Sequence, residues 1–270
     1  MLKIELKRAF KRKTFLFVLL LGTIISIVEN ITTNYYYIIF PYTNYIDFFE
    51  RYIKAPMNSP CEFFIFFYRS PLAYLLFIIM PILVAISYSD SYLEDLNSGF
   101  LKNILARCSK RKYLQNKFLA NFIISGITIS LPLLISLLMI LMTQANIYPE
   151  KTGNALIVGN LNVNMYLNHP VLFTLMWIFI FFIFAGVISS IALGFSIVIR
   201  NKFVVLIAPF ITINAIEILF SLIGLSDFSP VNFLIGCPDI NASAMLITFI
   251  IMLMLTFLPF YFGGKSNEIF

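Results

Sequence analysis

One acidic side chain of this 270-residue sequence stands in the middle of a long apolar run and is the first candidate for chemistry. Glu217 lies in the segment ITINAIEILF, and Asn214 precedes it by one helical turn. A carboxyl group inside an apolar membrane segment marks a functional site by default, because its transfer into hydrocarbon is unfavourable. Glu217 and Asn214 are therefore candidates for lining a translocation path or for stabilising a contact between subunits. A protonated Glu217 that is merely packed between helices is the alternative.

No other residues form a recognisable catalytic or metal-binding pattern. His169 is the single histidine, and a lone histidine forms neither a metal cluster nor a catalytic triad. The signatures H-E-x-x-H and G-x-S-x-G do not occur in the sequence. The sequence GGKS at 263–266 looks like the end of a phosphate-binding loop, but Pro259 stands where that loop requires glycine. We therefore expect no catalytic residue, no metal site and no ATP-hydrolysing site on this chain.

The amino-acid composition places the chain in a membrane. Hydrophobic residues make up 60% of the sequence and charged residues 12%, and the mean hydropathy is +0.91. Soluble domains are about 45–50% apolar and about 25% charged, so this chain has more apolar surface than one water-soluble core can bury. The net charge of +6 is confined to short segments beside the apolar runs, which disfavours nucleic-acid binding. We expect a single all-α, multi-pass membrane domain over residues 1–270.

Six apolar stretches are long enough to cross the roughly 30 Å of bilayer hydrocarbon as helices. They cover 14–36, 71–89, 118–143, 170–199, 203–224 and 242–262. With the N-terminus inside, 15 of the 19 lysines and arginines fall on the cytoplasmic side, as the positive-inside rule requires. Both termini are therefore predicted to be cytoplasmic. The abundance of Ile, Asn, Lys, Phe and Tyr is typical of an AT-rich bacterium, so we expect the membrane to be that of a bacterial cell.

Two segments on the predicted outer side differ from ordinary loops. Residues 37–70 form a long outer loop rich in Tyr and Phe, which favour the headgroup level. Residues 224–240 are too short to cross and too apolar to remain in water, so they predict a re-entrant hairpin before the last span. A loop with one buried side is the alternative. A disulfide between Cys61 and Cys237 is geometrically conceivable on this side, but two isolated apolar cysteines are the simpler interpretation.

The N-terminal segment 1–13 carries an apolar stripe. Leu2, Leu6 and Phe10 recur at helical spacing, while lysines and arginines occupy much of the remainder. This pattern predicts an amphipathic helix that lies along the inner membrane surface. A positively charged stop before the first span explains the charge equally well, but it does not explain the spacing.

The cytoplasmic segment 91–116, between the second and third spans, combines an acidic pair, an apolar stripe and a basic cluster. Its apolar residues recur at helical intervals, at Leu93, Leu96, Phe100, Ile104 and Leu105. Gly99 interrupts the stripe and would divide the segment into two short helices. A solvated hairpin whose charge only fixes the topology is the alternative, but such a hairpin needs neither the stripe nor the acidic pair. We therefore expect a helix that docks against another surface.

Residues 94–117 resemble the cytoplasmic loop of ABC-2 type transporter permeases. The shared pattern is E-D-x-x-x-G-x-L-K-x-x-L-x-R-x-S-x-R-x-Y-x-x-x-K. The family often has proline where Cys108 stands, a departure that leaves the pattern in place. The wider resemblance covers nearly the whole chain, because it includes the interfacial N-terminal helix, the six spans and the broken apolar hairpin before the last span.

In that family, this loop carries a coupling helix that docks into a cleft of a separate ATP-binding subunit. The resemblance implies that the coupling residues are Leu93, Glu94, Asp95, Leu96, Gly99, Phe100, Lys102, Ile104, Leu105 and Arg107. It also implies that ATP-driven motion reaches the spans through this segment, with help from the N-terminal helix. ATP and Mg²⁺ would be bound by the partner subunit, and a second permease copy or a homologous permease would complete the pathway.

Together these features predict the transmembrane subunit of an ABC exporter. By the resemblance, its cargo would be hydrophobic or amphipathic, such as an antimicrobial peptide, a drug or a lipid-like molecule. Two other classes stay open as alternatives. A membrane-embedded enzyme would need convergent polar residues within the spans, and a non-transporting sensor or immunity protein would have no use for a helix shaped to fit an ATPase.

Overall fold

The computed structural model describes residues 1–39, 61, 64, 70–144, 163–235 and 241–266. Every regular element in these ranges is a helix, and six helices among them are long and apolar enough to span a membrane. These six are α2 (Lys13–Ile39), α4 (Pro71–Tyr88), α7 (Lys110–Thr143), α9 (Pro170–Phe195), α10 (Lys202–Ile223) and α12 (Ala242–Ser266). The predicted all-α class and the six membrane-length helices are confirmed for this part of the chain.

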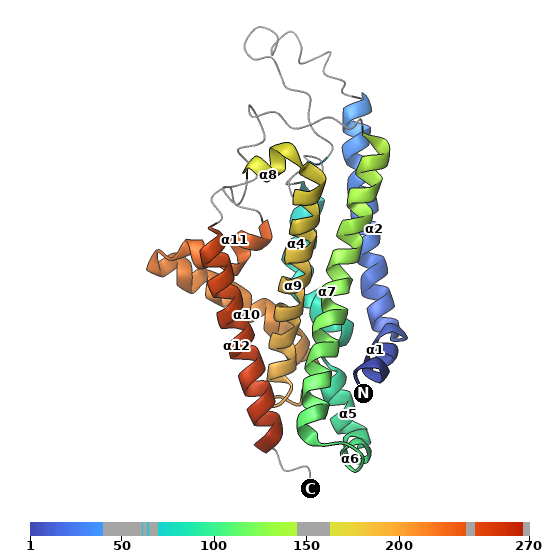
Figure 1. The fold of residues 1–270 in the computed structure, drawn as a ribbon, viewed down its shortest axis with the longest axis vertical. Helices are drawn as coiled ribbons and strands as arrows, with labels where there is room; N and C mark the ends of the chain where they lie inside the picture. The colour runs from blue at the N-terminus through green and yellow to red at the C-terminus, as the bar shows by residue number, and fades with distance from the viewer. Residues whose placement is uncertain (40–60, 62–63, 65–69, 145–162, 236–240, 267–270) are drawn as a thin grey trace.

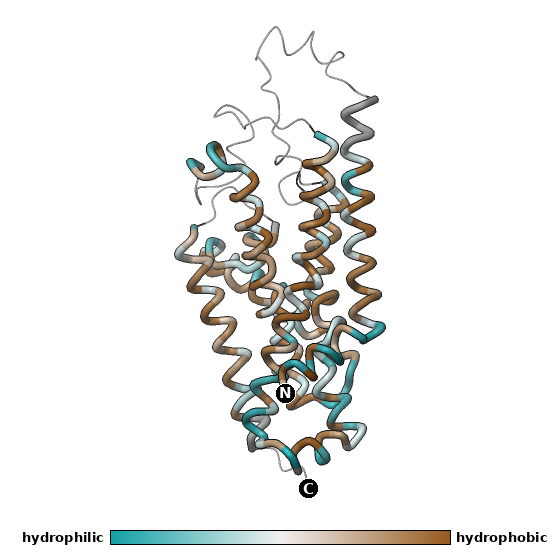
Figure 2. The backbone as a smooth tube through the Cα atoms, turned by 45° about the vertical axis from the view of Figure 1, so that its right-hand side comes forward, coloured by the Kyte–Doolittle hydropathy of each residue, from teal (hydrophilic) through white to brown (hydrophobic). Residues whose placement is uncertain are grey.

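Shorter helices lie in the connections. They are α1 (Leu2–Phe10), α5 (Ser91–Asn97), α6 (Phe100–Leu105), α8 (Val163–Asn168), η3 (Ser226–Phe228) and α11 (Pro230–Ile235). Figure 1 shows α1, α5 and α6 at one end of the molecule, with α8 and α11 nearer the other end. In Figure 2 the long helices are mostly hydrophobic, and hydrophilic residues gather at the end that carries the N-terminus. This distribution is the one expected of a multi-pass membrane protein.

Helices α7 and α9 lie at the centre of the bundle, where glycines and aromatic rings interlock. A Cβ atom added to Gly126 of α7 would lie 2.6 Å from the ring of Phe182, and one added to Gly186 of α9 would lie 2.6 Å from the ring of Phe122. The two rings meet edge to face, with their centroids 6.2 Å apart. Small residues allow membrane helices to approach closely. These two reciprocal contacts therefore fix both the rotation and the depth of α7 against α9.

Helix α7 is longer than the span predicted at 118–143, because it begins at Lys110. The segment from Lys110 to Lys117 contains no glycine or proline, so the helix continues for about 12 Å beyond the predicted span. The predicted loop over 91–116 is consequently shorter in the structure. It consists of α5, α6 and the turns around them.

Gly99 separates α5 from α6, which confirms the predicted break. Its φ of 70° lies in the left-handed region, which glycine adopts without steric penalty. No heavy atom lies within 4 Å of the position that a Cβ atom would take. The break therefore depends on the backbone conformation and not on crowding at this position.

The N-terminal stripe forms a helix, but its buried face differs from the predicted one. Leu2 and Leu6 pack against an apolar cluster that includes Ala9. Phe10, by contrast, is 44% exposed, whereas Glu5 is only 5% exposed. The face that contacts the rest of the protein therefore contains an acidic residue, and Phe10 lies at its margin, where its ring meets that of Phe15 edge to face.

Two short helices, η3 and α11, occupy the described part of the segment predicted as a hairpin. Phe233 and Leu234 are buried in the main apolar cluster. The Thr248 hydroxyl donates to the carbonyl oxygen of Phe228 at 3.0 Å, which ties this segment to α12. Residues 236–240, including Cys237, lie outside the described residues, as does most of the predicted outer loop. The insertion of the hairpin into the membrane stays a prediction, as does the favoured interpretation of Cys61 and Cys237 as two isolated cysteines.

Candidate functional site

Lys117 of α7 is the centre of a buried group of charges at the end of the molecule that carries α1, α5 and α6. Its Nζ donates to Asp95 Oδ2 at 2.5 Å and to Glu5 Oε2 at 3.1 Å. The side chains of Lys117 and Asp95 have no exposed surface, and that of Glu5 is 6% exposed. One buried ammonium group therefore joins α7 to α1 and to α5.

Two tyrosines complete the surroundings of this ammonium group. The Tyr88 hydroxyl donates to Glu5 Oε2 at 2.5 Å, and the Tyr113 hydroxyl donates to Asp95 Oδ2 at 2.7 Å. The Lys117 Nζ also lies 5.3 Å from the Tyr88 ring centroid and 5.7 Å from that of Tyr113. Aromatic faces attract cations. Each carboxylate thus accepts from one ammonium and one hydroxyl group, and two rings shield the ammonium from solvent.

Arg8 of α1 closes the group from the other side. Its Nη1 donates to Asp95 Oδ1 at 2.5 Å, and its Cζ lies 5.4 Å from the ring centroid of Phe100. Partial burial disfavours the charged form, but the hydrogen bond and the charge of Asp95 outweigh it and raise the pKa of Arg8 above its ordinary value. Glu5, Arg8, Asp95 and Lys117, named here the Lys117 cluster, contain two cations and two anions. The cluster therefore has no uncompensated charge, the condition that burial requires.

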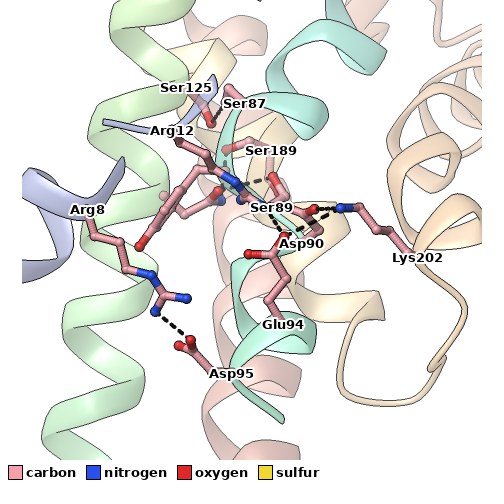
Figure 3. Close-up of polar contacts among 12 residues, drawn as sticks. Arg8, Arg12, Ser87, Ser89, Asp90, Glu94, Asp95, Ser125, Ser189 and Lys202 are labelled. Carbon is pink, nitrogen blue, oxygen red and sulfur yellow. Dashed lines mark hydrogen bonds and ion pairs between the residues drawn. The ribbon is translucent and has the colours of Figure 1, made fainter. Parts of the chain in front are cut away.

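A second balanced group lies beside the first and is named here the Arg12 cluster. Arg12 donates from Nη1 to Asp90 Oδ1 at 2.5 Å and from Nη2 to Glu94 Oε1. Lys202 Nζ lies 2.6 Å from Asp90 Oδ2 and 3.5 Å from Glu94 Oε1. Figure 3 shows these side chains converging from three parts of the chain. The cluster connects the turn between α1 and α2 to α5 and to the start of α10.

A layer of neutral polar side chains follows toward the middle of the bundle. The Ser89 hydroxyl donates to Asn121 Oδ1 at 3.1 Å, and Asn121 Nδ2 donates to the Ser189 hydroxyl at 3.0 Å. The hydroxyl oxygens of Ser87 and Ser125 are 3.2 Å apart. All five side chains are buried, and the four serines are labelled in Figure 3. Hydrogen bonds between membrane helices stabilise their packing, so this layer holds α4, α7 and α9 at a common depth.

The predicted coupling residues fall into an anchored half and an exposed half. In α5, Leu93 and Asp95 are buried, and Glu94 belongs to the Arg12 cluster. Beyond α5, the exposed residues are Gly99, Phe100, Lys102 and Arg107. Leu96, Ile104 and Leu105 are partly buried and pack against a small apolar cluster. Helix α5 is therefore an anchor. The accessible surface is the segment from Asn97 to Arg107, which contains α6 and the turns on either side of it and is named here the exposed turn.

Asn214 and Glu217 both lie on α10, at the surface of the chain. Asn214 is exposed, and its Nδ2 donates to the carbonyl oxygen of Phe210 at 2.7 Å. Glu217 is partly buried, and no described residue forms a hydrogen bond with its buried Oε2. Their assignment to a translocation path stays a prediction.

No three His, Cys, Asp or Glu side chains among the described residues lie close enough together to hold a metal ion. Lys117 is part of a predicted basic segment, and neither Glu5 nor Tyr88 was among the predicted site residues. One signal was present in the sequence, because Glu5 falls between Leu2 and Ala9 on the apolar side of the N-terminal helix. An acidic residue in that position indicates a buried partner.

Comparisons with protein-family models, with curated proteins and with solved structures found no match to this chain. The two charged clusters and the exposed turn beside them are therefore the basis on which a function is assigned.

Proposed function

We propose that this chain is the membrane-spanning subunit of an ATP-driven exporter of the ABC-2 permease type. In this proposal the exposed turn, Asn97 to Arg107, receives motion from a separate ATP-binding subunit. The observation that carries the proposal is the connection of an exposed turn, through buried ion pairs, to several membrane-length helices at once.

The buried contacts make α5, the helix that leads into the exposed turn, part of a rigid unit. Asp95 of α5 is bound by Arg8 of α1 and by Lys117 of α7. Asp90, just before α5, is bound by Lys202 at the start of α10. Packed elements of this kind move as bodies and do not bend smoothly. A push that passes from α6 to α5 would therefore reach α1, α7 and α10 together, which is what a coupling element has to do.

The chemistry of the exposed turn fits a protein partner with an acidic cleft. Phe100 is 45% exposed. The exposed cations near it in sequence are Lys102, Arg107, Arg111 and Lys112. The acidic residues of α5, Glu94 and Asp95, already pair with cations of the two clusters. Aromatic and arginine side chains are the usual anchors of protein interfaces, so an apolar floor with an acidic rim would complement this turn.

The remaining parts of the proposal rest on the family resemblance together with the chain's surface. ATP and Mg²⁺ belong on the partner subunit, and the cargo is hydrophobic or amphipathic and moves outward. The charged end faces the cytoplasm of a bacterial cell, so both termini lie inside. Two apolar residues of α1, Ile4 and Phe10, are 70% and 44% exposed. Side chains of this kind insert at the level of the headgroups, which supports an interfacial position for α1.

If a P-loop ATPase is encoded beside this chain's gene, its co-expression with the chain tests the proposal. We expect the wild-type chain to copurify with the ATPase, and Phe100→Asp to abolish copurification, because it places a negative charge opposite an acidic cleft. Phe10→Asp is the matched control, since Phe10 and Phe100 have nearly the same exposed fraction. Full copurification of the Phe100→Asp variant would show that the exposed turn is not the docking surface. A wild-type chain that binds no ATPase would overturn the function itself.

A further inference from the structure

A hollow of about 330 Å³ lies between α9, α10 and α12, apart from the two charged clusters. Its lining includes Gly194 and Val198 at the end of α9, Thr212 on α10, and Leu255 and Pro259 on α12. Helices α10 and α12 both pack against α9, and Figure 1 shows them on one side of it. Sites for small molecules measure roughly 300–1,000 Å³. The hollow is therefore large enough to hold a ligand.

The lining of the hollow suits an apolar ligand. No charged residue is among the described residues that line it. The hydroxyl groups of its two threonines are already used within their own helices, because Thr212 donates to the carbonyl oxygen of Ala208 at 2.9 Å and Thr256 donates to that of Leu253 at 3.0 Å. A polar ligand needs polar groups that fix its orientation. The hollow offers no free side-chain donor of this kind, so a hydrocarbon chain fits it best.

The hollow opens on the outside of the bundle. Two of its lining residues, Val198 and Leu255, are 82% and 66% exposed. On α12 the lining runs from Met252 to Pro259, which is about 10 Å along the helix axis. All three helices are long and apolar enough to span a membrane. An open, elongated hollow on the side of such helices faces the acyl chains of the bilayer, which run parallel to the spans.

A cation stands close to the charged end of the hollow. Arg200 is exposed and follows the lining residue Val198 by two positions, so their Cα atoms are at most about 7 Å apart. Among the described residues, no carboxylate forms an ion pair with Arg200, whereas Lys202 of the same connection is bound by Asp90 and Glu94. The arginine fork matches the geometry of a phosphate group. Arg200 is therefore suited to hold a phosphate beside the hollow.

We propose that this hollow binds an anionic phospholipid of the inner leaflet, with the chemistry of phosphatidylglycerol. One acyl chain of the lipid fills the hollow between α9, α10 and α12, and its phosphate is bound by Arg200. Basic sites between membrane helices on the cytoplasmic side bind anionic headgroups in this way. The lipid is a resident ligand that fills the space between three helices and is not a cargo. Its binding needs no ATP-binding subunit, so the site can hold even if the proposed transport function fails.

Photo-crosslinking of the purified chain in phosphatidylcholine vesicles tests the position of the acyl chain. The probe is phosphatidylglycerol with a diazirine on one acyl chain, and labelled residues are mapped by mass spectrometry. We expect labelling to concentrate between Met252 and Pro259. Gly194→Leu, whose side chain fills the hollow, should lose most of it, whereas Gly194→Ala, with its nearest atom at 3.6 Å, should keep it. Equally strong labelling of Leu20, a 58% exposed residue of α2, would overturn the proposal even if Gly194→Leu does not fold.

A comparison of headgroups tests the role of Arg200. With identical acyl chains, the phosphatidylglycerol probe should label the hollow about fivefold more strongly than a phosphatidylcholine probe, because one cation favours the anionic headgroup. Arg200→Gln should remove this preference. Arg111→Gln is the matched control, since it removes an exposed arginine from another part of the same end of the molecule and should keep the preference. Equal labelling of the wild-type chain by both probes, or an equal loss of preference in both variants, would contradict the proposal.

Discussion

Lys117 and Asp95 form an ion pair whose Nζ to Oδ2 distance is 2.5 Å and whose two side chains have no exposed surface. The pair joins a membrane-length helix, α7, to the short helix α5. A buried pair of this kind is weak evidence of net stability, because desolvation of both charges offsets their attraction. Its effect on structure is strong, however, since each charge is tolerated only while the other stays in place. The pair therefore fixes the position of α5 against α7, and α5 leads directly into the exposed turn.

Removal of the Lys117 charge should destabilise the protein severely. Lys117→Met leaves Glu5 and Asp95 buried beside a single remaining cation, Arg8, and we expect the free energy of unfolding to fall by about 3–5 kcal/mol. Unfolding of the purified protein in mixed micelles of increasing denaturing detergent measures this change. Lys112→Met, at an exposed position of the same helix, should change the free energy of unfolding by less than about 0.5 kcal/mol. Similar losses in both variants would contradict the role of the cluster.

The Tyr113 hydroxyl supports the same carboxylate. Tyr113→Phe removes its 2.7 Å hydrogen bond to Asp95 Oδ2 and leaves a buried acceptor short of one donor. We expect a loss of about 1–3 kcal/mol in the free energy of unfolding. Tyr92→Phe is the control, because Tyr92 is buried to nearly the same extent but its hydroxyl is not a donor to Asp95. A loss that is no larger for Tyr113→Phe than for Tyr92→Phe would show that the hydroxyl contributes little.

The two cations of the Arg12 cluster should differ in their contribution. The Arg12 side chain is 14% exposed and binds both Asp90 and Glu94, whereas the Lys202 side chain is 47% exposed. Lys202→Met should therefore lower the free energy of unfolding by at most about 1 kcal/mol. Arg12→Met should lower it by about 2–3 kcal/mol, since it removes charge-assisted hydrogen bonds from a mostly buried position. The same detergent titration ranks the two variants. A larger loss for Lys202→Met than for Arg12→Met would contradict the predicted difference between the two cations.

Contact between α7 and α9 depends on the glycines under the two phenylalanine rings. Gly186→Ala places a methyl group 2.6 Å from the Phe122 ring, and we expect a loss of about 1–3 kcal/mol. Gly194→Ala, on the same helix, meets its nearest atom at 3.6 Å and should be nearly neutral. Adding Phe122→Leu to Gly186→Ala should recover part of the loss, because the smaller side chain removes the clash. Equal stability of the two alanine variants in thermal unfolding would exclude the clash.

Several features of the fold could be predicted from neighbouring residues because their causes are local. The six spans follow from runs of apolar residues as long as the bilayer is thick. The break at Gly99 follows from one residue that enters the left-handed region without steric penalty. The start of α7 at Lys110 was missed because charge, not helix propensity, decided the predicted boundary.

The site itself could be predicted only in part. The segment that joins α4 to α7 was identified from its acidic pair, its stripe and its basic cluster, yet the stripe alone could not show which of its members are buried. Leu93 packs inward against α4 and α9 side chains, whereas Phe100 is left at the surface. A helical stripe has two possible neighbours, the rest of the chain or another protein, and only the packed fold decides between them.

By itself, the sequence determined that this chain forms apolar helices of membrane length, separated by charged segments, because hydrophobic runs and the spacing of charges are properties of consecutive residues. The tertiary structure alone decided that Glu5, Asp95 and Lys117 meet, since Glu5 and Lys117 are 112 positions apart and nothing near either residue in the chain specifies the other. It also decided that Asn214 faces outward, because the direction of a side chain on α10 depends on which face packs against α4 and α9. Long-range pairing of charges and the choice of a buried face arise from the packing of whole helices, which no local pattern encodes.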